Sequence, residues 1–434
     1  MIKLKQTLIG KIPEDWEVVR LKDVIAFYQT GIWGEDPIPG EDVYPVIRST
    51  EITHDGKLNL SGIALRKIPK NKVDKYRLEN GDIILVGSSG SSHLVGRVAL
   101  FHQPSDSRVY LFSNFMIRIR PKNIDPKFLY YFLSSSSYQA FLKRLQQTST
   151  GLRNLPKKEF LSLLIPLPPL HEQKAIAKVL STCDEAIQKV DEAIAKTERL
   201  KKGLMQELLT KGIGHTEFKD TEIGFKKYKI AKKWIIKNLT EISIIRGRIG
   251  WHGLKDEDYL KEGDYYLVRG IDFENGKILW DKCIYISKQW YERDSNIQLK
   301  EGDVLITKDG SIGKIAFVDK LPKKATLGTG IFLIRRRNND YLPQYLFYIL
   351  QSEFFDNFIK FIKAGSTLSH LYQKDLVKFE IPLPPFSEQR RIAEILSTVD
   401  KKLELERKRK EKLERIKKGL MNDLLTGRKR VKIK

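Results

Sequence analysis

The segment Asp309-Gly-Ser-Ile-Gly-Lys-Ile315 has some of the residues of a phosphate-binding loop. Such a loop needs four residues between its first glycine and the Gly-Lys-Ser/Thr, so that backbone N–H groups can wrap around the phosphates. Here two residues separate Gly310 from Gly313, and Ile315 stands where a metal-binding hydroxyl belongs. We therefore expect a turn between two strands rather than a nucleotide site.

Metal-binding and redox residues are sparse. The seven histidines form no H-x-H or H-x-x-x-H pair, and Cys183 and Cys283 are far apart, whereas a zinc site needs closely spaced ligands. Asp303 could open a nuclease strand, but the following Ile306-Thr-Lys308 supplies no second acid. The sequence predicts no metal site, no cofactor and no catalytic residue in this chain.

Five residues whose side chains could do chemistry have simpler interpretations. Asp82 and Asp303 each follow a glycine, and we expect them to hydrogen-bond backbone in the turn that opens a strand. Trp16 and Trp234 could stack on bases, but their apolar neighbours favour a role as core anchors. His171 stands where the second copy of a repeat has serine, so we expect it to be exposed or to cap a helix.

Charge points to a polyanionic partner. Lys and Arg number 78 against 54 Asp and Glu, giving a net charge of +24, and nucleic acid is the commonest partner of so basic a protein. Lysine-rich surfaces also arise from selection for solubility or for life at high temperature. No apolar run approaches the roughly 18 residues of a membrane span, and two cysteines fit a reducing compartment. We expect a cytoplasmic protein with no membrane contact.

The chain is an internal repeat, in which one sequence unit occurs twice. Residues 165–182 read IPLPPLHEQKAIAKVLST and residues 381–398 read IPLPPFSEQRRIAEILST, 216 positions later. The offset holds for LKKGLMQELLT from Leu200 and IKKGLMNDLLTG from Ile416. The roughly 150 residues before each Pro-rich signal keep only a skeleton of similarity. Two domains that diverge on a fixed framework are suited to recognising two different targets.

Each globular part mixes strands and helices without a βαβ rhythm, which indicates a mixed α/β (α+β) fold. The expected strands are 82–86, 97–101 and 115–120 in the first copy, and 303–306, 314–318 and 331–335 in the second. A helix with proline in its first turn is expected to follow at 126–133 and at 343–350.

A long helix follows each Pro-rich signal. No proline occurs from His171 to Thr210 or from Phe386 to Thr426, and apolar residues recur at steps of three and four, as in a coiled-coil seam. We expect the two helices, each of about 40 residues and ~60 Å, to pair as an antiparallel coiled coil with pseudo-two-fold symmetry. The alternative is that each packs on its own domain. The expected seams are Ile176, Leu180, Cys183, Ile187, Val190, Ile194, Leu204 and Leu208, with Ile392, Leu396, Val399, Leu403, Leu413, Ile416, Leu420 and Leu424. The domain boundaries that follow are 1–170 and 213–386 for two recognition domains, 171–212 and 387–427 for two helices, and 428–434 for a basic tail.

The duplicated Ile-Pro-Leu-Pro-Pro, Glu-Gln and Ile-Ala-x-x-Leu-Ser-x-x-Asp elements resemble those of the specificity subunits of type I restriction–modification enzymes, over essentially the whole chain. The resemblance implies a subunit that reads a split double-stranded DNA target through two target-recognition domains. It implies two methyltransferase (M) subunits docked on the helices, which use S-adenosylmethionine, and restriction/translocase (R) subunits, which use ATP and Mg²⁺. Those cofactors would belong to the partner subunits.

Polar, glycine-bearing loops that differ between the copies are the candidates for DNA contact, because loops carry binding residues and a few side chains read base edges. A plain solvated loop is the alternative for any single residue. The matched Arg48 and Arg269 suggest a phosphate contact or an internal ion pair. Arg153 and Asn154 lie opposite Ser369 and His370, as two readers of different sequences should differ. The candidate DNA-binding residues are Arg48, Ser88, Ser89, Ser91, His93, Thr150, Arg153, Asn154, Arg269, Lys308, Ser311, Ser366, Thr367 and His370.

Two other functions remain open at this stage. A nuclease with duplicated binding domains would cleave DNA in the presence of Mg²⁺. A scaffold protein would use the paired helices for assembly, and its positive charge would be incidental. Such a protein would show no salt-sensitive binding to one particular DNA sequence.

Overall fold

The computed structural model describes residues 3–40, 42–147, 153–223, 226–248, 254–363 and 370–431. The chain divides into two compact units, the first made of Met1–Asp191 with Lys408–Lys434 and the second of Glu192–Arg407. Two 39-residue helices, α5 (Leu170–Leu208) and α11 (Phe386–Leu424), each contribute one segment to each unit. At 1.5 Å per residue each helix is about 58 Å long. Across the described part of the chain, none of the helices combines the length and the apolar character that a membrane crossing requires.

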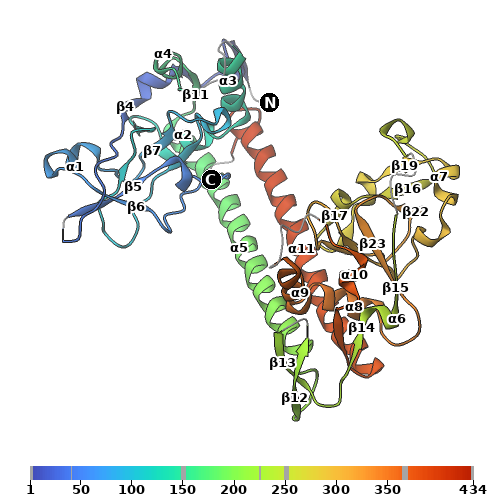
Figure 1. Ribbon diagram of the computed structural model, residues 1–434. Coiled ribbons are helices and arrows are strands. Elements are labelled where there is room, and N and C mark those ends of the chain that lie inside the picture. The colour runs from blue at the N-terminus through green and yellow to red at the C-terminus, as the bar shows by residue number, and fades with distance from the viewer. Residues whose placement is uncertain are drawn as a thin grey trace. The chain divides into compact units, whose positions relative to one another are not determined.

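The first unit is built on a four-stranded antiparallel sheet of order β4-β10-β7-β8 (Figure 1). A second, smaller sheet has the order β6-β5-β9, and two strand pairs, β1–β2 and β3–β11, complete the unit. Its strands are β1 (Leu4–Thr7), β2 (Gly10–Pro13), β3 (Glu17–Arg20), β4 (Ile25–Thr30), β5 (Val43–Ile47), β6 (Ala64–Lys67), β7 (Ile83–Val86), β8 (Val98–Leu100), β9 (Leu111–Phe112), β10 (Met116–Pro121) and β11 (Leu164–Leu167). Its shorter helices are α1 (Lys70–Tyr76), α2 (Pro126–Phe132), α3 (Ser136–Gln147) and α4 (Lys157–Leu161).

The second unit repeats this plan. Its four-stranded sheet has the order β15-β23-β20-β21, its smaller sheet β19-β16-β22, and its strand pairs are β12–β13, β14–β24 and β17–β18. Its strands are β12 (Phe218–Ile223), β13 (Lys226–Ala231), β14 (Ile235–Asn238), β15 (Ser243–Gly247), β16 (Tyr265–Val268), β17 (Phe273–Glu274), β18 (Lys277–Ile278), β19 (Ile284–Ile286), β20 (Val304–Thr307), β21 (Ile315–Phe317), β22 (Lys324–Leu327), β23 (Ile331–Arg336) and β24 (Glu380–Leu383). Its shorter helices are α6 (Leu239–Ile242), α7 (Lys288–Glu292), α8 (Pro343–Leu350), α9 (Glu353–Lys363) and α10 (Gln373–Leu376).

The strands and helices expected from the sequence are present in both units. The three strands of each four-stranded sheet that the pattern predicted are β7, β8 and β10, and β20, β21 and β23. Both α2 and α8 begin with a proline in the first turn, where its missing N–H costs nothing. The segment that resembled a phosphate-binding loop connects β20 to β21, as expected of a turn between strands.

The Glu-Gln pair of the repeated motif joins each long helix to its globular part. Trp16 and Trp234 are buried in the two cores, and the indole N–H of each donates to the motif glutamate, Glu172 at 3.0 Å and Glu388 at 3.2 Å. The expectation that both tryptophans are core anchors is confirmed.

The glutamine of the same motif supports a second helix. Gln173 accepts a hydrogen bond from the Asp125 N–H at the start of α2, at 2.8 Å. Gln389 accepts one from the Leu342 N–H at the start of α8, at 2.7 Å. Free N–H groups at a helix start need such acceptors when they are buried. The repeated motif is therefore explained by its structural role, and His171 beside it is exposed, as expected.

Within each unit the two long helices run antiparallel and are tied by ion pairs, one of which is matched between the units (Figure 1). In the first unit Lys417 of α11 lies 2.5 Å from Asp184 of α5, which also accepts a hydrogen bond from Tyr131 at 2.7 Å. In the second unit Lys201 of α5 lies 2.6 Å from Asp400 of α11, which accepts from Tyr348 at 2.8 Å. Burial raises the pKa of both tyrosines well above the ordinary value, so they act as neutral donors. The expected antiparallel pairing is confirmed inside each unit.

The ends of the long helices also enter the domain cores. Ile176 and Leu180 pack with Leu424 in the core of the first unit, and Leu208 packs with Ile392 in the core of the second. The two alternatives drawn from the sequence therefore both hold, because the same helix ends pair with each other and pack on a domain. The prediction for Ile416 was wrong: its side chain is 44% exposed rather than in the seam.

The aspartates that open β7 and β20 have the expected role and one more. Asp82 accepts from the Glu79 N–H at 2.9 Å, and Asp303 accepts from the Lys300 N–H at 2.7 Å, as predicted for turn-forming aspartates. Each also forms a two-pronged ion pair with an arginine of the neighbouring strand, Arg120 or Arg335, with all four distances between 2.7 and 2.9 Å. The carboxylates are 1% exposed, so they stabilise the fold and are not available for chemistry.

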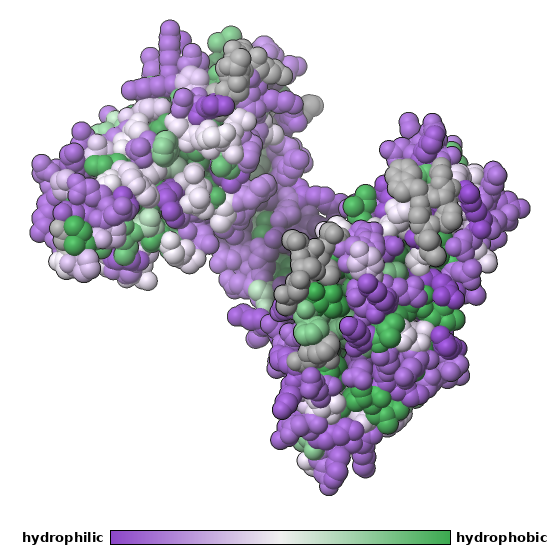
Figure 2. Space-filling view, viewed as in Figure 1, coloured by the Kyte–Doolittle hydropathy of each residue, from purple (hydrophilic) through white to green (hydrophobic). Residues whose placement is uncertain are grey.

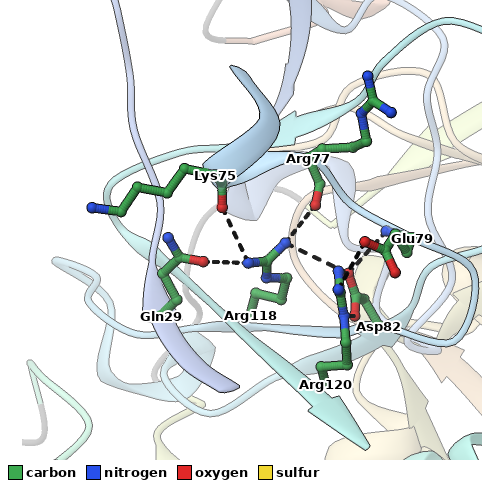
Figure 3. A network of polar contacts seen from close by, with 7 residues as sticks. All are labelled: Gln29, Lys75, Arg77, Glu79, Asp82, Arg118 and Arg120. Atoms are coloured by element: carbon green, nitrogen blue, oxygen red, sulfur yellow. Dashed lines mark hydrogen bonds and ion pairs between the residues drawn. The ribbon is translucent and has the colours of Figure 1, made fainter. Parts of the chain in front are cut away.

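A buried arginine on β10 of the first unit has no counterpart at the matching position of the second unit (Figure 3). Arg118 on β10 is 4% exposed and points toward the carbonyl oxygens of Lys75 and Arg77 and the side chain of Gln29, to all of which it donates. Its Nε has no hydrogen-bond partner, and burial lowers the pKa of the guanidinium. By the pairing of Arg120 with Arg335, the matching position in the second unit is Leu333, which is fully buried.

Candidate nucleic-acid interface

In the first unit the structure brings together two loops that are about 60 residues apart in the sequence. Ser88, just after β7, forms a β-bridge with Asn154. The Ser89 N–H donates to the Arg153 carbonyl at 3.0 Å, and the Leu155 N–H donates to the Gly87 carbonyl at 2.8 Å. Arg153 and Asn154 are exposed there, so the ladder presents their side chains outward. We refer to residues 87–93 and 153–155 as the first face.

Glycine is required where the first face leaves the sheet. A Cβ on Gly87 would lie 2.7 Å from the Ile117 side chain, closer than real Cβ atoms come. The chain can therefore turn over the buried strand at this point only without a side chain. Beyond the turn, Ser88 and Ser89 are half-buried, whereas Ser91 and His93 are exposed.

The second unit builds the equivalent arrangement with different side chains. Asp309, just after β20, forms a β-bridge with His370, and the Leu371 N–H donates to the Lys308 carbonyl at 2.8 Å. The Asp309 carboxylate also contacts Nδ1 of His370, which makes an ion pair when the imidazole is protonated. Thr307 shapes the loop by donating to the Ser311 carbonyl at 2.5 Å and accepting from the Lys314 N–H at 2.9 Å. We refer to residues 308–311 and 370–372 as the second face.

A hollow of about 510 Å³ adjoins the second face, and Asp309, Gly310, Ser311 and Lys314 are among the residues that line it. Gly270, Gly328 and Gly330 also contribute to its wall and keep it free of side chains there. Its lining combines the apolar side chains of Leu254, Leu267 and Ile271 with donors, one acid and bare backbone.

Arg48 and Arg269 have matched internal partners. Nη2 of Arg48 lies 2.7 Å from Glu51, and Nη2 of Arg269 lies 3.0 Å from Asp272. Both acids are nearly inaccessible, at 6% and 1% side-chain exposure, whereas the arginines are 38% and 30% exposed. The hydrogen bond to Glu51 raises the pKa of Arg48, so this guanidinium stays charged. Of the two interpretations, the internal ion pair is present, and contact with DNA by either arginine stays a prediction.

The remaining candidates are placed as follows. Lys308 and Ser311 lie on the second face, with Lys308 Nζ 5.2 Å from the centre of the Phe332 ring. Thr150, Ser366 and Thr367 lie outside the described residues. No group of three or more His, Cys, Asp or Glu side chains that could hold a metal occurs among the residues the structure describes.

Sequence reasoning missed one residue of the second face. Asp309 lies in a loop that the sequence singled out, but it was not among the candidates. The signal that could have found it is the difference between the copies, because a charged residue stands where the first face has the neutral Ser88. Hydrophilic residues cover most of the surface of both units that is visible in Figure 2, so polarity alone did not mark this position.

These features define a duplicated recognition protein, with two readers of the same architecture and different side chains on a shared helical framework. The model of the "Type I restriction modification DNA specificity domain" matches residues 13–199 and 231–415, so the chain belongs to this family. It is 31% identical to the type I restriction enzyme MjaVIII specificity subunit of Methanocaldococcus jannaschii, covering 97% of this chain and 95% of that one. It is 23% identical to the StySPI specificity subunit of Salmonella potsdam, covering 90% and 82%.

A solved structure shares the fold. The crystal structure of the type I restriction–modification S subunit from M. genitalium superposes with a TM-score of 0.57 at 17% identity, covering 96% of this chain and 97% of that one. The mixed α/β fold with two recognition domains and long helices, expected from the sequence, is confirmed.

Proposed function

We propose that this chain is the non-catalytic DNA-specificity subunit of a type I restriction–modification enzyme and reads a bipartite double-stranded target. The observation that carries the proposal is the pair of faces. The same two loops are joined by the same backbone bridge in both units, yet the side chains there are Ser88 and Asn154 in one and Asp309 and His370 in the other. In this proposal residues 1–170 and 213–386 are the reading domains, and residues 171–212 and 387–427 hold them.

The charge and the faces supply different parts of DNA recognition. The excess of 24 positive charges gives phosphate affinity that is independent of sequence. Arg153, Asn154 and His370 supply groups that can bind base edges, since arginine pairs best with guanine and asparagine with adenine. Ser88, Ser89, Ser91, His93, Lys308 and Ser311 lie on the same loops and complete the proposed contact surface.

The partners in this proposal are two methyltransferase subunits and the restriction subunits. Those partners use S-adenosylmethionine, ATP and Mg²⁺. The residues of this chain position the partners and select the DNA sequence. The relatives support this assignment, since the chain matches over nearly its full length a protein named as the specificity subunit of a type I restriction enzyme.

A binding selection tests the proposal. The purified full chain is incubated with random duplexes, and we expect it to enrich one sequence with two fixed parts and an unread spacer. About eight phosphate contacts would give a slope of log affinity against log salt near −7. A slope shallower than about −3 would show that the charge is not a DNA footprint, and the absence of an enriched sequence would overturn the proposed function.

Single substitutions then assign the faces. Arg153→Ala should relax selection in one half-site, and His370→Ala should relax it in the other, each by about 5- to 150-fold for a lost pair of 1–3 kcal/mol. In each variant the untouched half-site is the internal control. A variant that weakens all sequences equally would identify that residue as a phosphate contact instead.

A further inference from the structure

We infer that Asp309 reads an exocyclic amino group, on cytosine or adenine, in the half-site bound by the second unit. This inference rests on the proposed function. It assigns a specificity role to a residue that lies among positive charges and whose carboxylate has no other favourable contact with DNA.

Hydrogen-bond chemistry limits which groups of DNA Asp309 can bind. An ionised carboxylate only accepts hydrogen bonds. The phosphodiester backbone of DNA offers acceptor oxygens and carries negative charge, so a carboxylate brought to it is repelled. In the major groove the donors are the N4 amino group of cytosine and the N6 amino group of adenine, whereas guanine O6 and thymine O4 accept. The minor groove offers one further donor, the N2 amino group of guanine. A carboxylate that reads the major groove therefore distinguishes amino bases from keto bases.

The position of Asp309 meets the geometric requirement. It follows β20 directly, its backbone is bridged to His370, and its side chain is 41% exposed. The bridge and the contact from His370 to Oδ1 fix the orientation of the carboxylate. Fixed acceptors discriminate better than mobile ones, because less conformational entropy is lost on binding.

The second oxygen of the carboxylate is left accessible by glycine. A Cβ built on Gly330 would lie 3.4 Å from Oδ2 of Asp309, in van der Waals contact, so a side chain at that position would reduce the room beside this oxygen. Gly330 also has φ of +81°, a conformation that glycine adopts without strain. Gly310, next to Asp309, has open space around its Cα. The bare backbone gives a base edge room to approach Oδ2.

The surroundings explain how an acid is tolerated on a basic surface. Lys308 precedes it, and Lys314 and Arg269 line the same hollow. These cations offset the repulsion between the carboxylate and DNA without forming a hydrogen bond in place of the base. In the first unit the bridged position is Ser88, whose hydroxyl both donates and accepts and therefore does not separate amino from keto bases.

Binding selections with the full chain test the inference. Asp309→Ser, which installs the residue of the first face, and Asp309→Asn, which preserves shape, are compared with the unaltered chain. We expect both variants to admit guanine or thymine at one position of one half-site, where the unaltered chain requires cytosine or adenine. Asp74→Asn removes an acid that is 88% exposed in the first unit, and as a control it should leave the selected sequence unchanged.

A base analogue then tests the contact at the level of one amino group. At the position identified, adenine is replaced by purine, or cytosine by 2-pyrimidinone, so that only the amino group is lost. The unaltered chain should lose about 5- to 150-fold in affinity, and Asp309→Ser should bind both duplexes equally. The base that is selected tells which of the two amino groups is read.

The outcomes distinguish a failure of the proposed function from a failure of the role of Asp309. An unaltered chain that enriches no sequence overturns the proposed function and this inference together. An enriched sequence that stays the same in Asp309→Ser, or that is weakened uniformly at every position, overturns the role of Asp309 alone. Uniform weakening would show that the aspartate affects phosphate binding alone, whereas relaxed selection at the same position as in His370→Ala would show that it only supports His370.

Discussion

The two units share a framework, and three of the differences between them change charged or polar contacts. Both use the same tryptophan–glutamate bond, the same glutamine at a helix start and the same lysine–aspartate pair between the long helices. They differ in a buried residue of the sheet, in the cation at the motif glutamate and in the bridged side chains of the faces. The shared contacts all lie where the long helices meet the domains. These contacts hold each long helix in the same way, although much of the globular parts has diverged.

The cation at the motif glutamate shows how one role is filled in two ways. In the first unit Arg430, after the end of α11, lies 2.6 Å from Glu172 and 2.7 Å from Asp15. In the second unit His215, after the end of α5, lies 3.0 Å from Glu388. Hydrogen bonds to Asp15 and Glu172 raise the pKa of Arg430, so this guanidinium is always charged. An imidazole carries a charge only when it is protonated.

Exchanging the buried residues of the two sheets should cause the largest loss of unfolding free energy. Leu333→Arg places a guanidinium in a fully buried site whose nearby acid, Asp303, is already bound by Arg335. We expect a loss of more than about 3 kcal/mol in unfolding free energy, because the added charge has no free partner. Urea unfolding checks this, with Leu333→Met as the control for shape. A difference between the two variants of under about 1 kcal/mol would contradict it.

Removing the cation at each glutamate should give unequal losses. Arg430→Ala leaves Glu172, which is 1% exposed, with the Trp16 N–H as its remaining donor among the contacts described above. We expect a cost of about 2–3 kcal/mol, below the value for a fully buried pair because the arginine is 31% exposed. His215→Ala should cost about 1 kcal/mol, since Glu388 keeps the Trp234 and Ile213 N–H donors.

Hydrogen exchange measured by mass spectrometry localises these two losses. Protection should fall at the start of α5 in Arg430→Ala and at the start of α11 in His215→Ala. Equal losses in the two variants, or a loss spread evenly over both units, would argue that the two contacts are not local equivalents.

The reverse exchange, Arg118→Leu, should have a smaller effect. It removes the donors to the Lys75 and Arg77 carbonyls, but it also removes a guanidinium whose charge is disfavoured by burial. We expect a net loss of about 1–2 kcal/mol, with faster hydrogen exchange confined to α1. Arg108→Leu, at a side chain that is 49% exposed, is the matched control. Unchanged protection of α1 would mean that Arg118 does not hold this helix.

The sequence predicted the framework well because its signals are local or duplicated. Strand patterns, the prolines that begin α2 and α8, and the tryptophans repeated in both halves identify their elements without knowledge of the fold. Arg118 could not be found in this way, since its partners on α1 and β4 come from distant segments. The pairing of Asp184 with Lys417 was also beyond the sequence, because it needs the register of two helices. Whether the chosen loop residues contact DNA, and where the domains are best divided, stay predictions.

Lowering the pH should destabilise the first unit slightly more than the second, because of Asp15. The hydrogen bond from Arg430 lowers the pKa of Asp15 in the folded chain, and the second unit has Lys233 before its tryptophan, where the first has Asp15. A carboxyl whose folded pKa is depressed adds stability above its unfolded pKa of about 3.9, and that stability is lost as pH falls through the folded value. The Asp15 side chain is 49% exposed, so solvent limits the contribution to a few tenths of a kcal/mol. Asp15→Asn should therefore be slightly less stable than the unaltered chain at pH 7, and the gap should shrink below about pH 4. Urea unfolding at a series of pH values measures it. A gap of the same size at pH 7 and at pH 3 would show that Asp15 contributes through its shape and not through its charge.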